Sequence, residues 1–238
     1  MGEGTKAYYE GFEDYGTLYD TGIWRQYRRV AASMVIAALP DRPGLRVLDL
    51  GGGALLSLRE LHADPRVSDY VVVDLVVRLP AGLPKVRSVT SDILSFIKGY
   101  SGPAFDAVIF FGVLEYLSDT DAAAALRLLP ALLAPDGQVL VHEPNARAAA
   151  YMTRGDGEQK TVELEALLPG TGLELIERRD YDLPRLRTVL AKLKIKSPAL
   201  LRAALTFERA LGGGVDSLYR LSAARGRDRG SDGPSPTP

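Results

Sequence analysis

The stretch from Arg46 to Ala54, RVLDLGGGA, constrains the fold of this chain more than any other. Val47, Leu48 and Leu50 form the short apolar run that is typical of a strand covered on both faces. Three consecutive glycines follow, which allow a tight turn and let a ligand lie against the backbone. From Leu55 onward the apolar residues recur at helical spacing. The sequence therefore predicts a buried strand, a glycine-rich turn and a helix, which is the basic unit of α/β proteins.

Two acidic residues flank this turn. Asp49 precedes Gly51 by two residues, and Asp74 follows Gly51 by 23, near the offset of about 20 at which an acid meets ribose hydroxyls. A lone carboxylate is costly to bury inside an apolar strand, so we expect Asp74 at the strand's end, in a cleft. The GxGxxG dinucleotide pattern is incomplete because Leu56 takes its third glycine position, and no phosphate-loop Gly-Lys-Ser/Thr follows. An NAD-dependent dehydrogenase is therefore disfavoured.

Composition narrows the class of protein. A length of 238 residues fits one sizeable domain with embellishments, and 46% hydrophobic and 25% charged residues are ordinary for a globular protein. A net charge of -1 argues against nucleic acid as a partner. The absence of cysteine excludes disulfides and thiolate metal sites, and two histidines make a metal centre unexpected. No apolar run reaches ~18 residues, so we expect a cytoplasmic protein without membrane insertion.

Strand and helix patterns alternate along the rest of the chain. Further strands are predicted at residues 69–77, 86–89, 105–110, 138–143, 173–181 and 216–224. Helices are predicted at residues 23–39, 119–133 and 161–168, the last with Thr161 as its cap. A loop is expected at residues 77–85, which contain two prolines and a glycine, and a turn is expected at Pro135-Asp136-Gly137.

The order apolar-apolar-Asp-x-Gly-x-Gly over residues 47–53 resembles motif I of the class I S-adenosylmethionine (SAM)-dependent methyltransferases, with Leu55 at the usual third glycine. FDAVIFFGVLEYL at residues 105–117 and LAPDGQVLVHEPN at residues 133–145 resemble later segments of that family. The resemblance covers about residues 45–182 and returns at the last strand. It implies an α/β fold with a seven-stranded, mostly parallel, Rossmann-like sheet flanked by helices, and SAM as the cofactor, with S-adenosylhomocysteine (SAH) as its product.

The resemblance also implies roles for individual residues. The glycine turn would hold the methionine part of the cofactor, Asp74 both ribose hydroxyls, and Asp92 the adenine amino group. Asp92 is equally suited to cap the helix that follows it. The predicted cofactor-binding residues are Asp49, Gly51, Gly52, Gly53, Asp74, Leu75, Ser91, Asp92, Ile93, Phe111 and Gly112.

Two residues are candidates for catalysis, His142 and Tyr116. His142 falls at the carboxyl end of the fifth strand, where open α/β sheets place ligands, and an imidazole suits a general base. Alternatively, His142 closes the strand as a polar residue satisfied by loop backbone. Tyr116 stands where the family carries the histidine of its LEHL segment. A base is needed only for a protonated acceptor, since most of the acceleration comes from aligning donor and acceptor.

We predict three parts along the chain. Residues 1–44 form an N-terminal helical lid, residues 45–224 the methyltransferase domain, and residues 225–238 a tail that is disordered by composition. Tyrosines and an arginine of the lid would meet a ligand carboxylate, or else the aromatic-rich helix simply packs on the sheet edge. Residues 184–211 are predicted as a basic helical insertion between the last two strands, either a solvated face or a surface that contacts substrate or an anionic membrane.

The predicted function is methyl transfer from SAM, by in-line displacement, to an oxygen, nitrogen or carbon atom of a small-molecule acceptor such as a sugar or secondary metabolite. Assembly into a homodimer is left open. One alternative is a methyltransferase that acts on RNA, lipid or another macromolecule, for which binding would fall steeply with added salt. Another is a non-catalytic SAM-binding module, which the departures at Leu55 and Tyr116 keep open.

Overall fold

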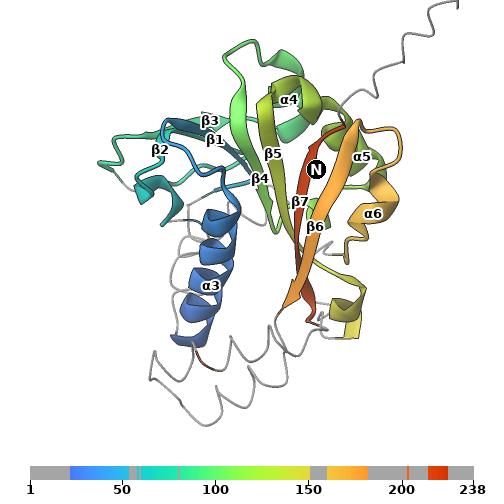
Figure 1. The fold of residues 1–238 in the computed structure, drawn as a ribbon. Helices are drawn as coiled ribbons and strands as arrows, with labels where there is room; N and C mark the ends of the chain where they lie inside the picture. Colours follow the sequence, from blue (N-terminus) through green and yellow to red (C-terminus); the bar gives the residue numbers. More distant parts are fainter. Residues whose placement is uncertain are drawn as a thin grey trace, which may run out of the picture.

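A single seven-stranded sheet forms the centre of the molecule (Figure 1), in a computed structural model that describes residues 22–53, 58, 60–79, 81–150, 160–181, 203 and 214–224. The strand order is β3-β2-β1-β4-β5-β7-β6, with β7 antiparallel to β5 and β6 and the others parallel. The strands are β1 (Leu45–Leu50), β2 (Val67–Asp74), β3 (Val86–Thr90), β4 (Phe105–Phe111), β5 (Leu133–Pro144), β6 (Leu173–Tyr181) and β7 (Asp216–Ala223). The predicted fold class is confirmed.

Helices cover both faces of the sheet (Figure 1). One face carries α3 (Gly22–Ala38), and the other carries α4 (Ile93–Gly99), α5 (Asp119–Leu128) and α6 (Leu164–Leu167). Because side chains alternate along a strand, Val47 packs in the α3 core while its neighbour Leu48 packs in the core under α4 and α5. Short 3-10 turns, η1 (Leu61–Ala63), η2 (Leu114–Tyr116), η3 (Leu129–Leu132) and η4 (Ala146–Ala150), connect the larger elements.

The strand order places a ligand crevice between β1 and β4. From β1 the chain continues outward through β2 and β3, and it returns to the other side of β1 at β4. In open parallel sheets this reversal leaves a crevice at the carboxyl ends of the two strands. The segments that follow Leu50 and Phe111 are therefore the ones that can border a ligand.

Element boundaries agree with the sequence in some places and differ in others. The helix predicted at residues 23–39 is confirmed as α3. The second strand was predicted to run to Val77 but ends at Asp74, so this carboxylate lies at the strand end, as expected. The helix predicted at residues 119–133 ends at Leu128 and tightens into η3, since Pro130 lacks the N–H that a longer α-helix needs.

Two further expectations are wrong in detail. Pro135-Asp136-Gly137 was predicted as a turn, yet β5 begins before it at Leu133 and passes through it with an irregular register. Asp136 still has the positive φ of 63° that a turn residue adopts. The helix predicted at residues 161–168 is reduced to α6, whose N-cap position is Glu163 and not Thr161.

Several predictions fall outside the described residues. They concern the lid before Gly22, most of the helix after the glycine turn, the insertion at residues 184–211 and the tail at residues 225–238. The expected domain boundaries therefore remain predictions. Within the described part of the chain, no helix combines the length and apolar character that crossing a membrane requires.

Candidate functional site

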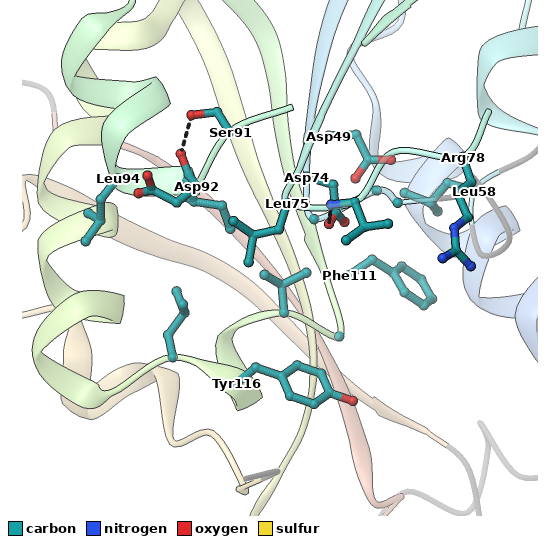
Figure 2. A pocket seen from close by; sticks show the side chains of 18 of the residues that line it. Asp49, Leu58, Asp74, Leu75, Arg78, Ser91, Asp92, Leu94, Phe111 and Tyr116 are labelled. Carbon is teal, nitrogen blue, oxygen red and sulfur yellow. Dashed lines mark hydrogen bonds between the residues drawn. The ribbon is translucent and has the colours of Figure 1, made fainter. Parts of the chain in front are cut away.

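A pocket lies at the carboxyl ends of the central strands (Figure 2). All eleven predicted cofactor-binding residues line it, and so does Tyr116, whereas His142 is not part of its lining. Asp92 and Ser91 lie at one end, Asp49 and Arg78 at the other, and Leu75 between them (Figure 2). The remaining lining residues are Arg28, Leu58, Val76, Leu94, Val113 and Leu117.

The glycine turn leaves no room for side chains. Gly51 has a φ of +85°, and a Cβ there would lie 2.3 Å from a methyl group of Val113. A Cβ on Gly52 would lie 2.5 Å from Oδ2 of Asp49, closer than nonbonded atoms approach. The chain can therefore turn here only because glycine accepts these conformations and contacts.

Asp49 is a buried carboxylate with one partnered oxygen. Its Oδ2 accepts a hydrogen bond of 2.7 Å from the hydroxyl of Tyr70, which lies on the neighbouring strand β2. Its Oδ1 is buried and has no hydrogen-bond partner among the described residues. Burial raises the pKa of Asp49 to about 7, with the Tyr70 hydrogen bond opposing the rise and the charge of Asp74 adding to it.

Asp74 ends β2 and faces the same turn. Its side chain accepts a hydrogen bond of 3.0 Å from the backbone N–H of Val76, and its backbone carbonyl accepts one of 3.0 Å from Ser91. Burial raises the pKa of Asp74, and hydrogen bonds from nearby backbone N–H groups oppose that rise. A second, half-buried carboxylate therefore lies beside Gly53, whose hypothetical Cβ would be 3.2 Å from Oδ2 of Asp74.

Asp92 caps the helix that follows it, which is one of the two roles that the sequence suggested. Its Oδ1 accepts a hydrogen bond of 2.9 Å from the backbone N–H of Ser95, so it caps α4. That hydrogen bond lowers the pKa of Asp92. Asp92 also lines the pocket, at the end opposite Asp49 (Figure 2), and Ile93 is a further lining residue.

A buried carboxylate from β5 holds the backbone segment after β4 that borders the pocket. Glu143 is fully buried and accepts hydrogen bonds from the backbone N–H groups of Val113 (2.8 Å), Leu114 (2.8 Å) and Glu115 (3.2 Å). Burial raises its pKa despite these three donors. Glu143 thereby fixes the start of η2, which carries Tyr116. This role of Glu143 could not be predicted from the sequence, because nothing local links residues so far apart in the chain.

His142 lies behind Phe111. The two rings stack with centroids 3.9 Å apart and planes 3° from parallel, and the backbone carbonyl of His142 accepts a 2.8 Å hydrogen bond from Gly112. Only 6% of His142 is exposed, and neither ring nitrogen has a hydrogen-bond partner among the described residues. Burial lowers the pKa of His142, which favours the neutral ring.

Two arginines in the pocket were not among the predicted site residues. Arg28 extends from α3, and Arg78 follows the acidic end of β2. An arginine of the N-terminal segment was predicted to meet a ligand carboxylate in the lid interpretation, and Arg28 is the arginine of that segment that lines the pocket among the described residues. Among the described residues, no group of three or more potential metal-ligating side chains is found.

Comparison with known proteins adds a family and a set of related folds. The sequence model of a family described as "Methyltransferase domain" matches residues 23–191, which is more than half of the chain. No curated protein sequence matches the chain closely enough to count as a relative.

Solved structures share the fold at low sequence identity. A SAM-dependent methyltransferase from Archaeoglobus fulgidus has a TM-score of 0.60 at 17% identity, with 90% of this chain and 99% of that chain covered. The 1,6-didemethyltoxoflavin-N1-methyltransferase of Burkholderia thailandensis has a TM-score of 0.58 at 18% identity, with 93% and 89% covered. The [4+2]-cyclase SpnF has a TM-score of 0.56 at 20% identity, with 84% and 82% covered.

Proposed function

The chain belongs to the class I SAM-dependent methyltransferases, and from this premise we propose that it methylates a small-molecule acceptor. The observation that carries the proposal is that all eleven predicted cofactor residues line the same pocket together with Tyr116. When bound, SAM supplies a methyl group on a positively charged sulfur. The residues of this chain bind and orient the cofactor and the acceptor, which is the main source of acceleration in such a transfer.

The polar groups of the pocket fit the parts of SAM in order along its length. At one end Asp49 offers a buried carboxylate oxygen without a partner among the described residues, which suits the ammonium of the methionine part. We propose that Arg28 meets the carboxylate of the same part. Asp74 is proposed for the ribose hydroxyls and Asp92 for the adenine amino group, with Leu75 and Ile93 against the ring.

The acceptor side is proposed at Phe111, Gly112 and Tyr116. These residues follow β4, and Glu143 holds the backbone that carries Tyr116. Tyr116 is proposed to contact the acceptor, because it lines the pocket. For His142 the geometry favours a supporting role behind Phe111 over direct proton transfer, because His142 is buried and outside the pocket lining.

A small acceptor is supported by charge and by one similar structure. The chain has a net charge of -1, which gives no general attraction to a polyanion. The similar Burkholderia thailandensis structure contains 1,6-didemethyltoxoflavin and SAH, and its enzyme methylates that small molecule. The fold alone does not fix the reaction, since the similar SpnF structure is described as a cyclase.

Calorimetric titration tests the proposal directly. The purified protein is titrated in parallel with SAM, SAH and NAD, and we expect binding of both sulfur compounds and none of NAD. Candidate small molecules are then incubated with protein and SAM, and formation of SAH is measured. Binding of NAD alone would contradict the assignment of the pocket. Methyl transfer only to RNA, lipid vesicles or protein, together with acceptor binding that weakens steeply as salt is added, would contradict the proposal of a small-molecule acceptor.

A further inference from the structure

Tyr70 is a buried tyrosine whose hydroxyl donates a hydrogen bond to Asp49. It lies in the middle of β2, has no exposed surface and packs in the core beneath α3. In the parallel register Tyr70 pairs with Val47, two residues before Asp49, and this offset brings its hydroxyl to Oδ2 of Asp49 at 2.7 Å. Phenylalanine would fill the same apolar space, so the hydroxyl matters only for this hydrogen bond.

The two carboxylate oxygens of Asp49 have different surroundings. A Cβ on Gly52 would lie 2.5 Å from Oδ2 and 2.9 Å from Val72, so the glycine turn packs closely against this oxygen. Oδ2 is therefore held between Tyr70 and the turn. The other oxygen, Oδ1, is buried and has no hydrogen-bond partner among the described residues. Because Asp49 lines the pocket, Oδ1 is the oxygen that is available to a ligand.

We propose that Tyr70 is a positioning residue that holds Asp49 as an oriented carboxylate for the ammonium of the cofactor, so that cofactor binding is coupled to release of the Asp49 proton. The inference rests on the proposed function, because it takes a cofactor with a methionine ammonium as the ligand of this pocket. Tyr70 is outside the pocket lining, so it acts through Asp49 and not by touching the cofactor.

The charges around Asp49 determine the direction of the coupling. Asp74 at the end of β2 is a second acid that favours the protonated form of Asp49, and the Tyr70 hydroxyl favours the ionised form. Arg28 from α3 and Arg78 after β2 line the same pocket. Without ligand, burial keeps the pKa of Asp49 at about 7, so near neutral pH a substantial fraction of the protein carries the proton. A cationic ammonium against Oδ1 favours the carboxylate, and the proton leaves.

The main experiment compares two ligands that differ only in the part Asp49 would meet. SAH carries the amino-acid group, whereas 5′-methylthioadenosine keeps the adenine and ribose but lacks it. Both are titrated into the wild type and the Tyr70→Phe variant between pH 6 and pH 9. For Tyr70→Phe we expect SAH to bind about 10- to 100-fold more weakly near pH 7, the range for a lost hydrogen bond to a charged group, with methylthioadenosine unchanged. The pH below which SAH binding weakens should also rise in the variant.

A matched control separates this effect from a general loss of tyrosine hydroxyls. Tyr219 on β7 is equally buried but packs in the other core, and it does not line the pocket. Tyr219→Phe should leave the affinity for both ligands at the wild-type value. Thermal unfolding of both variants shows whether they fold.

A second variant keeps the inference testable if Tyr70→Phe does not fold. Asp49→Asn removes the titrating group and should weaken SAH but not methylthioadenosine. Titration of SAH in two buffers with different ionisation enthalpies counts the protons released. We expect a fraction of a proton per SAH for the wild type near pH 7 and none for Asp49→Asn.

Three results would distinguish the outcomes. Equal weakening of SAH and methylthioadenosine in Tyr70→Phe would make Tyr70 a purely structural residue and overturn the inference. No proton release by the wild type would overturn the coupling to Asp49. Failure of the wild type to bind SAH at all would instead contradict the proposed function on which the inference rests.

Discussion

The two edges of the parallel sheet differ in how their carboxylates are partnered. At the amino edge, Asp69 accepts hydrogen bonds from Arg46 and Arg87, and these partners hold its pKa below the usual range. At the carboxyl edge, Asp49 and Asp74 form no ion pair with any described arginine or lysine, and burial raises the pKa of both. Carboxylates paired within the chain stabilise the fold, whereas buried carboxylates left without a cation indicate where a ligand belongs.

The antiparallel end of the sheet resembles the amino edge. Asp180 at the end of β6 accepts hydrogen bonds from Arg178, Arg147 and Ser217, and the pKa of this carboxyl is lowered although burial opposes the change. Its partners hold β6 and β7 together near Asn145, which donates to Ser217. This network is complete without a ligand, so we interpret it as structural.

The largest effect is expected from filling the space above Asp49. Gly52→Ala places a methyl group 2.5 Å from Oδ2 of Asp49, so either the carboxylate or the turn must move. We expect SAH affinity to fall roughly 100-fold or more and the free energy of unfolding to drop by about 1–3 kcal/mol. Gly99→Ala, at the end of α4 with nothing within 4 Å of its hypothetical Cβ, is the matched control and should change neither quantity. If Gly52→Ala bound SAH with the same affinity as the wild type, the close contact between Gly52 and Asp49 would have no role in cofactor binding.

Exchanging one carboxylate at each edge tests the comparison itself. Asp74→Ala should weaken SAH binding by roughly 1–3 kcal/mol, the cost of unmade hydrogen bonds to a charged group, without lowering thermal stability. Asp69→Ala should lower the free energy of unfolding by up to about 1 kcal/mol and leave SAH binding unchanged, because its arginine partners lie at the opposite edge. Calorimetry and thermal unfolding measure both. If the two variants behaved alike, the edges would not differ in role.

The pH dependence of stability should have opposite signs at the two edges. Asp49 has a pKa of about 7 in the folded protein and about 3.9 in the unfolded chain. At pH values between these two, its carboxyl group is therefore protonated mainly in the folded state. Its contribution to stability therefore falls as pH rises from 4 to 7, at up to about 1.4 kcal/mol per pH unit. The pKa of Asp69 is lower in the folded protein than in the unfolded chain. Its ion pairs therefore stabilise the fold fully at pH values above the pKa of the unfolded chain, and this stabilisation is lost as the pH falls through the pKa of the folded protein.

Chemical unfolding of the wild type, Asp49→Asn and Asp69→Asn across this range measures both contributions. The free-energy difference between wild type and Asp49→Asn should grow from pH 4 to 7 in favour of the variant. For Asp69→Asn the difference should favour the wild type above the unfolded pKa and shrink on acidification below it. A wild-type advantage over Asp49→Asn at pH 7 in the absence of ligand would show that Asp49 has a partner we have not identified.

The features that could be predicted from the sequence depend on residues that are adjacent in the chain. The apolar runs gave the strands, and the order Asp-x-Gly-x-Gly gave the turn and its carboxylate. Helix ends were less accurate, because Pro130 acts on the backbone hydrogen bonds of one particular turn. The irregular start of β5 depends on its register with β4, which periodicity does not contain.

Contacts between distant residues could not be predicted. Tyr70 reads in the sequence as one more large residue in an apolar strand, and only the register of β1 against β2 brings it to Asp49. Glu143 likewise meets its three backbone donors through the fold, about thirty positions from them in the chain. The residues that contact a ligand were therefore easier to identify than the residues that position them.

The smallest expected effect concerns His142, which shares the carboxyl edge but is not proposed to carry charge. Because burial lowers its pKa, the ring should titrate below the ordinary value of about 6.5. Nuclear magnetic resonance of the imidazole nitrogens measures this, and a His62→Gln variant assigns the two histidine signals. A ring whose pKa lies below the ordinary value and does not respond to SAH fits a support for Phe111. A pKa near or above 7, or protonation during turnover, would restore His142 as a general base and place the acceptor on its side of the Phe111 ring.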